Sequence, residues 1–171
     1  MQLNSLDVLV ILKIAAIGHE SWTQTSLAAD LFVAQSLVHS SLKRAEAARL
    51  FLPSKKRIPL QAVTEFMVHG VKYAFPPTRG GLTRGIPTAY AATPLLDSIV
   101  QPDTPPPVWP YAEGTVRGCE FEPIDKRAPK AAMNDEQLYE LLVLIDAIRD
   151  GRPREAKMAA ELLENRLAVG K

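Results

Sequence analysis

The sequence predicts a mainly α-helical protein. Apolar residues recur at helical spacing through most of residues 1–75 and again in residues 131–171, as in helices with one side in a core. Between these regions, residues 76–130 hold most of the chain's 14 prolines, and proline interrupts regular helix. We therefore expect three parts: residues 1–75, a Pro/Gly-rich ordered connecting segment at 76–130, and a C-terminal helical hairpin at 131–171 for dimerisation or partner binding.

The first helix is predicted at residues 4–18. Asn4 or Ser5 can cap it, Asp7 in its first turn complements the helix dipole, and Gly18 ends it. Its apolar residues lie on more than one side. Such a helix is buried on most faces, and a second subunit is one candidate for covering it.

Two helices follow, at residues 24–31 and 35–50, separated by a short break at 32–34. Thr23 is the expected cap of the first of them. In the second, Val38, Leu42 and Ala45 lie along one side, and the polar residues project elsewhere. Residues 51–60 contain two prolines and the basic run 55–57, and predict a turn with short extended pieces. A fourth helix is expected at 60–75.

The middle segment contains two glycine–arginine stretches, at 78–85 and 115–118. Its interspersed aromatic residues favour an ordered structure packed on its neighbours, although its prolines make regular helix improbable. A helix at 133–150 then follows, with Asn134 as its expected cap and Gly151 at its end. Pro153 suits the first turn of a final helix at about 153–168.

The segment from Thr23 to Leu50 resembles the helix-turn-helix of bacterial winged-helix regulators of the multiple-antibiotic-resistance and arsenical-resistance repressor type. The small Ala28 stands where the two helices of that motif cross, and Gln35-Ser36 opens the second helix. The motif's apolar positions are filled by Leu31, Val33, Val38 and Leu42, and its polar and basic positions by His39, Ser40, Lys43 and Arg44. The chain departs from the family where Phe32 replaces a frequent glycine, and at 51–60, where prolines leave little room for a wing.

The resemblance implies a winged helix-turn-helix domain at residues 1–75 and a transcriptional regulator, a repressor, that binds double-stranded DNA as a homodimer. Short polar side chains near the start of a recognition helix let its backbone approach base edges, while Lys and Arg further along reach phosphates. The predicted DNA-binding residues are Thr23, Gln24, Gln35, Ser36, His39, Ser40, Lys43, Arg44, Lys55, Lys56, Arg57, Arg79 and Arg84.

Charge is unevenly distributed along the chain. Residues 1–90 carry ten Lys and Arg against five Asp and Glu, whereas residues 91–171 carry ten against fourteen. A basic first half suits a polyanion. The acidic second half leaves open an antitoxin or adaptor that holds a partner protein, such as a toxin enzyme, and regulates its own operon. The same fold can also bind proteins only, and a subunit of a nucleic-acid-processing enzyme is a weaker alternative.

Several other kinds of site are not expected. No apolar run reaches the roughly 18 residues of a membrane span, and we expect neither a signal peptide nor catalytic residues. The single cysteine, Cys119, favours a reducing cytoplasm, and the three histidines lie apart, so we expect no metal and no cofactor. The arginines of stretch 78–85 belong either to a tight structural loop or to a loop that reaches a minor groove or phosphates.

Overall fold

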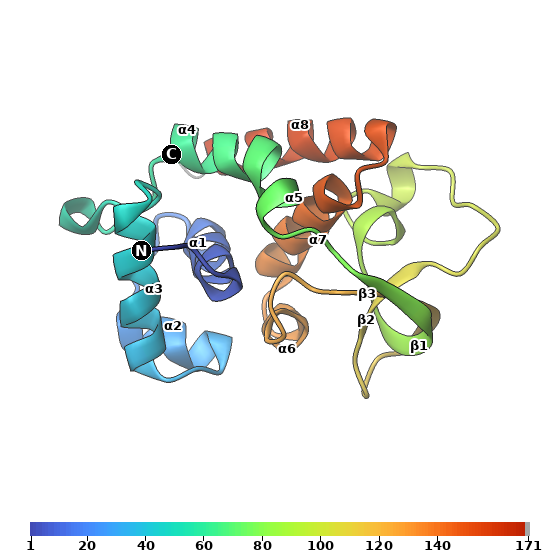
Figure 1. Cartoon of the computed structure of the whole chain (residues 1–171), viewed down its shortest axis with the longest axis horizontal. Helices are drawn as coiled ribbons and strands as arrows, with labels where there is room; N and C mark the ends of the chain where they lie inside the picture. The colour runs from blue at the N-terminus through green and yellow to red at the C-terminus, as the bar shows by residue number, and fades with distance from the viewer. Residues whose placement is uncertain (170–171) are drawn as a thin grey trace.

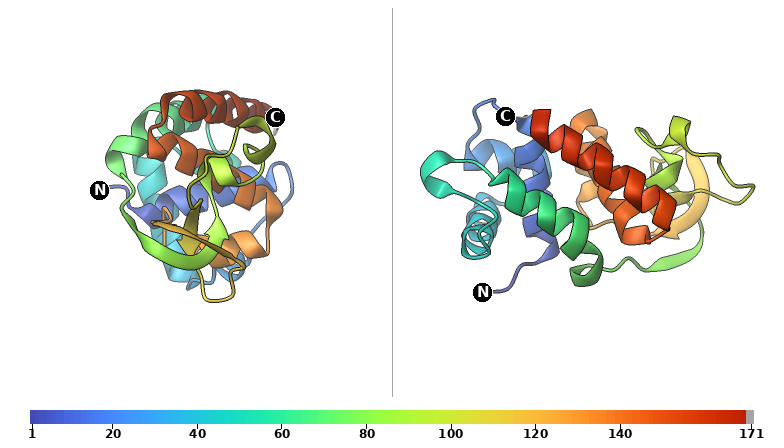
Figure 2. Two further views of the ribbon diagram at one scale, coloured as in Figure 1. Left: turned by 90° about the vertical axis from the view of Figure 1, so that its right-hand side faces the viewer. Right: turned by 90° about the horizontal axis from the view of Figure 1, so that it is seen from above.

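In the computed structural model, which describes residues 1–169, the chain is mainly helical with one small β-sheet (Figure 1). Its elements are α1 (Ser5–Ile17), α2 (Gln24–Leu31), α3 (Gln35–Ala47), α4 (Leu60–Glu65), α5 (Val71–Ala74), β1 (Arg79–Pro87), β2 (Pro107–Pro110), β3 (Val116–Phe121), α6 (Ala128–Met133), α7 (Glu136–Asp150) and α8 (Pro153–Val169), with short 3-10 turns at Pro53–Lys55, Ala89–Ala91 and Leu96–Ser98. Helices α1–α3 form one end of the molecule and the sheet lies at the other (Figures 1 and 2).

Helix α1 begins with the predicted cap. The Asn4 side chain accepts a hydrogen bond from the Asp7 N–H, and the Asp7 carboxylate accepts one from the Asn4 N–H, which makes a capping box. Every residue from Leu6 to Ile14 is buried, because α2, α3 and α7 pack around this helix. The chain itself therefore covers Leu6–Ile14, and no second subunit is needed to bury these residues.

Helices α2 and α3 follow the predicted boundaries closely. Thr23 caps α2 through a reciprocal pair of hydrogen bonds with Ser26. In the predicted break, Phe32 adopts a φ of 56°, the left-handed conformation in which the resembled family often has glycine. α3 begins at Gln35, as predicted, but ends at Ala47 instead of residue 50.

The chain between α3 and the sheet makes a compact turn and a bent helix. In the turn, Leu52 and Arg57 form a single antiparallel bridge across the 3-10 turn at Pro53–Lys55. The predicted helix at 60–75 is present as α4 and α5, joined by a π-helical turn at Phe66–Gly70. The prolines that follow end it.

The Pro/Gly-rich segment is ordered, as predicted, but it contains a sheet that its sequence pattern did not predict. β1 pairs antiparallel with both β2 and β3, and β2 and β3 pair in parallel, so the three strands close on one another. Small residues allow this, since a side chain on Gly114 would overlap the backbone of Gly85. The expectation of no helix in this segment is wrong at its end, where α6 begins at Ala128 with Pro129 in its first turn.

Helices α7 and α8 form the predicted C-terminal hairpin. The cap of α7 is Asp135, which accepts a hydrogen bond of 3.0 Å from the Leu138 N–H, and not Asn134 as predicted. Asn134 instead ends α6, so the short helix before α7 shifts the cap by one residue. Gly151, with a φ of 78°, ends α7, and Pro153 begins α8, both as predicted.

A buried polar network holds α7 against the sheet. The Asp146 carboxylate accepts hydrogen bonds of 2.7 Å from Thr88 Oγ1, Trp109 Nε1 and Arg149 Nη1. Arg149 also donates to the carbonyls of the two residues that flank the sheet, Phe75 and Glu122. Burial raises the pKa of Asp146, and Arg149 and the two other donors oppose that rise.

Lys13 links the two ends of the chain. Its Nζ lies 3.1 Å from Asp30 on α2 and 2.7 Å from Asp135, the cap of α7. Burial lowers the pKa of Lys13, but the hydrogen bonds and the negative charges of these two carboxylates together raise it by more. Residues of all three predicted parts share one hydrophobic core. Over the described residues, none of the helices is sufficiently long and apolar to cross a membrane.

Candidate nucleic-acid interface

The outer side of α3 is open and polar. Gln35, His39 and Lys43 are exposed on it, whereas Val38 and Ala45 on the inner side are fully buried. This division follows from the helical period, because residues 35, 39 and 43 lie one above another on the same face. The side chains predicted to face DNA are therefore not covered by later parts of the chain.

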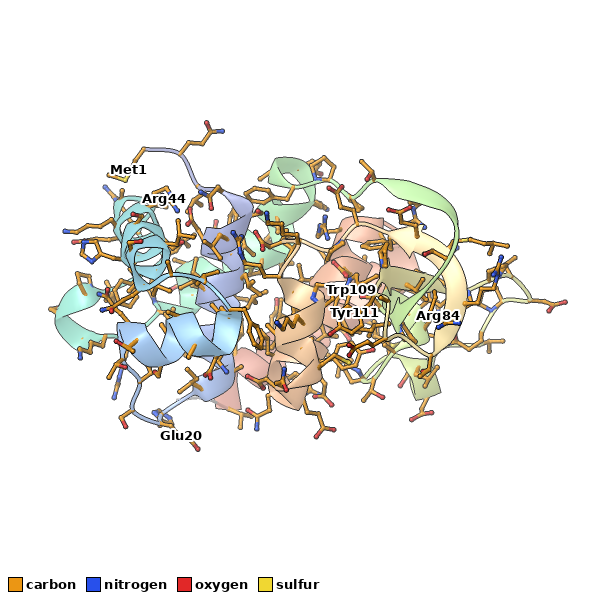
Figure 3. The ribbon with its side chains drawn as sticks, turned by 90° about the horizontal axis from the view of Figure 1, so that it is seen from below. Met1, Glu20, Arg44, Arg84, Trp109 and Tyr111 are labelled. Atoms are coloured by element: carbon orange, nitrogen blue, oxygen red, sulfur yellow. The ribbon has the colours of Figure 1, made fainter. Side chains whose placement is uncertain are left out.

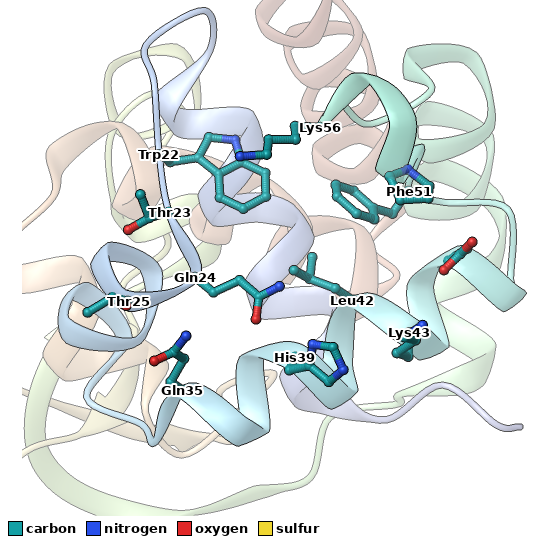
Figure 4. A pocket seen from close by; sticks show the side chains of 12 residues that line it. Trp22, Thr23, Gln24, Thr25, Gln35, His39, Leu42, Lys43, Phe51 and Lys56 are labelled. Atoms are coloured by element: carbon teal, nitrogen blue, oxygen red, sulfur yellow. The ribbon is translucent and has the colours of Figure 1, made fainter.

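A hollow of about 510 Å³ runs beside this face, between α3, the start of α2 and the 51–58 turn; we call it the α3 groove (Figure 4). Gln24, Gln35 and His39 lie along one side of it, with Trp22 and Lys56 across from them. Its lining residues are Trp22, Thr23, Gln24, Thr25, Gln35, His39, Leu42, Lys43, Glu46, Phe51, Pro53 and Lys56.

Aromatic side chains form part of the wall, and the sequence did not identify them as site residues. The rings of Trp22 and Phe51 lie 6.1 Å apart between centroids, tilted by 50°. Trp22 is half-buried just before the cap of α2, and Phe51 is buried just after α3. The only signal for these two residues in the sequence was that they flank the two helices. That signal does not distinguish the wall of a surface groove from the hydrophobic core.

The amide, imidazole and ammonium groups of the α3 groove give it hydrogen-bonding capacity with a net positive charge. Lys43 and Lys56 contribute two cations against the single carboxylate of Glu46. Gln35 and Gln24 each carry both donor and acceptor groups. The groove can therefore attract an anionic ligand and form directional hydrogen bonds with it.

Arg44 is placed differently from the prediction that it contacts phosphate. Its Nε and Nη2 atoms donate to the two carboxylate oxygens of Asp7, each at 2.8 Å. Asp7 is fully buried, and this pair connects α3 to the first turn of α1. The hydrogen bond with Asp7 raises the pKa of Arg44. Arg44 therefore positions α3 and is not part of the open face.

The remaining predicted residues near α3 are distributed around the groove. Thr23 lines it, although its hydroxyl accepts the capping hydrogen bond from the Ser26 N–H. Ser36 is exposed and Ser40 half-buried, and neither lines the groove. In the basic turn, Lys55, Lys56 and Arg57 are all exposed, but among these three the groove is lined by Lys56 alone.

Arg79 and Arg84 do not join this site. Both lie on β1, at the end of the molecule away from α3 (Figures 1 and 3). Arg79 forms an ion pair with Asp150 and stacks over the Phe121 ring at 5.3 Å. The strands carry these two arginines to the end of the molecule away from α3, so they do not lie on one face with the other predicted DNA-binding residues.

Two acidic residues that follow β3 have structural roles. Asp125 accepts hydrogen bonds from Ser5 and Arg127, and Glu122 accepts them from Thr78. No group of three or more His, Cys, Asp or Glu side chains within residues 1–169 is arranged to hold a metal ion.

Comparison of the chain with family models, with curated proteins and with solved structures found no match.

Proposed function

We propose that the chain binds double-stranded DNA by placing α3 in the major groove, and that it is a sequence-specific transcriptional regulator that acts as a repressor. The observation that supports this most is the exposed polar face of α3 beside a positively charged groove. In this proposal α2 and α3 are a helix-turn-helix, and residues 51–58 take the place of a wing, in line with the resemblance of Thr23–Leu50 to winged-helix regulators.

The groups around α3 divide into two kinds by the part of DNA that they suit. Gln35 at the start of α3 suits the paired donor and acceptor of an adenine edge, and His39 lies one turn further on the same face. The free N–H groups at the start of α2 and the basic turn at 55–57 suit phosphates. The residues that read bases would thus lie at the centre of the interface, and the groups that bind the phosphate backbone would lie on either side of them.

A homodimer would place two copies of α3 in successive major grooves of a two-fold symmetric site, and would exclude polymerase by occupying it. Because Leu6–Ile14 of α1 and most of α7 are enclosed by their own chain, we assign the dimer interface to the surface where the start of α7 meets the end of α8, around Leu162 and Val169. Arg154 and Lys157, at the start of α8, lie outside this surface.

The double change Gln35→Ala and His39→Ala is expected to weaken binding to the cognate site by about 1–3 kcal/mol for each base that is no longer read, with much less effect on random DNA. The cognate site would first be found by sequencing genomic fragments that the purified protein retains. Fluorescence anisotropy with both duplexes then measures the two affinities. An equal loss of affinity for cognate and random DNA would show that the base-reading surface lies elsewhere.

Changing Lys55, Lys56 and Arg57 together to alanine is expected to reduce the salt dependence of DNA binding. Each neutralised phosphate contributes about 0.9 to the slope of log K against log salt concentration. The slope is measured by titrating duplex at several salt concentrations. The control is Arg154→Ala with Lys157→Ala, which removes exposed cations of α8 far from α3. The same slope in the triple variant as in the unchanged protein would exclude the turn from the interface.

A further inference from the structure

Two arginines face each other across the sheet at the end away from α3. Arg84 on β1 is the direct register partner of Arg117 on β3, and both side chains are exposed. Residues directly opposite in an antiparallel pair have Cβ atoms about 5 Å apart, and like charges there repel. No carboxylate of residues 1–169 lies within 4.0 Å of either guanidinium.

Other arginines near the sheet differ from this pair, because each of them has a carboxylate of the same chain as its partner. Arg79 and Arg152 pair with Asp150, and Arg149 pairs with Asp146. Glu120 lies three residues after Arg117 on β3. Because side chains alternate between the two faces of a strand, Glu120 points to the other face, where its carboxylate lies beside Gly80. The Arg84–Arg117 pair thus keeps a repulsion that an external anion would relieve.

The backbone holds these two arginines side by side. β1 is hydrogen-bonded to β2 and β3, and the Arg84 carbonyl also accepts a hydrogen bond of 3.1 Å from the Tyr111 N–H. Figure 3 shows Arg84 and Tyr111 at this end of the molecule and Arg44 at the other. The charges are consequently concentrated at one place before any ligand arrives, which lowers the entropic cost of binding.

We infer that the Arg84–Arg117 pair is a second nucleic-acid site, which binds backbone phosphates of a DNA segment other than the one on α3. Guanidinium groups match phosphate oxygens in bidentate geometry. The pair is exposed, so one free phosphate would be attracted weakly in water, whereas a duplex presents a charge about every 1.7 Å. Because the two sites lie at opposite ends of the molecule, one copy would join two DNA segments; this rests on the proposed function of α3.

A two-duplex capture assay tests the inference. The cognate duplex is immobilised, the full chain is added, and retention of a labelled random-sequence duplex about one helical turn long is measured over a range of salt. The double change Arg84→Ala and Arg117→Ala is expected to leave binding to the immobilised duplex intact. It should reduce the salt slope of second-duplex capture by about 1.8, for two neutralised phosphates. Arg84→Lys with Arg117→Lys keeps the charges and should retain most of the capture.

The matched control is Arg154→Ala with Lys157→Ala, which removes the same charge from exposed positions on α8. Capture that is unchanged in the Arg84/Arg117 variant, or equally reduced in the control, would overturn the inference. Competition by inorganic phosphate at equal ionic strength would indicate a free-anion site, and equal competition by polyglutamate an acidic protein partner; either result also overturns it. Failure of the proposed function appears separately, as no difference between the Gln35/His39 variant and the unchanged chain on the immobilised duplex.

Discussion

Replacement of Asp146 by alanine is expected to lower the free energy of unfolding by about 3–5 kcal/mol, the usual cost of removing one partner of a buried ion pair. The change leaves the Arg149 guanidinium, only 2% exposed, without its carboxylate. It also removes the acceptor of the Thr88 and Trp109 hydrogen bonds, and unsatisfied buried donors are themselves costly. Urea denaturation followed by Trp fluorescence and far-UV circular dichroism measures the difference.

Asp103→Ala is the matched control, because Asp103 is exposed in the loop before β2 and makes no side-chain hydrogen bond or ion pair within the described residues. Its expected effect is within about 0.5 kcal/mol. A destabilisation below about 1 kcal/mol for Asp146→Ala would mean that the network of α7 does not anchor the sheet.

Replacement of Arg44 by alanine is expected to cost about 3 kcal/mol of stability and also to weaken DNA binding. The fully buried Asp7 carboxylate would lose its bidentate partner. Since this pair is the polar link between α3 and the start of α1, its removal would leave the recognition face less rigidly placed. Chemical denaturation gives the first effect, and anisotropy with cognate duplex under conditions where the variant is folded gives the second.

The double variant with Asp7→Ala separates the pair energy from other effects. If Asp7 and Arg44 stabilise each other, the double change costs less than the sum of the two single changes by at least about 0.5 kcal/mol. Lys157→Ala, on the exposed side of α8, should alter neither stability nor binding. Strict additivity would show that each residue acts through other neighbours.

Local signals in the sequence were sufficient for most helices. Asn4 and Thr23 accept hydrogen bonds from nearby N–H groups, and Gly151 adopts the left-handed conformation that ends α7. Each interaction joins residues only a few positions apart, so spacing and residue type predict it. The cap of α7 was predicted one residue too early because helix α6 was not expected before it. Proline usually interrupts helix, and Pro129 lies in the first turn of α6.

The candidate site was predicted in part. The helical period placed Gln35, His39 and Lys43 on one face of α3, and the structure leaves that face exposed. The aromatic wall of the α3 groove, which includes Trp22 and Phe51, was missed. Its two rings are separated by both helices in sequence, and nothing local brings them together.

The sequence by itself determined the helices, their ends and the polar face of α3, because these depend on hydrogen bonds and periodicities that span a few residues. Only the tertiary structure decided that Arg44 turns inward to Asp7, and that Arg84 meets Arg117 at the far end of the molecule. Both pairings join residues more than 30 positions apart. β1, which carries Arg84, contains three glycines and a proline, and neither β1 nor β3 shows the strict alternation that identifies a sheet, so their pairing depends on how the whole chain packs.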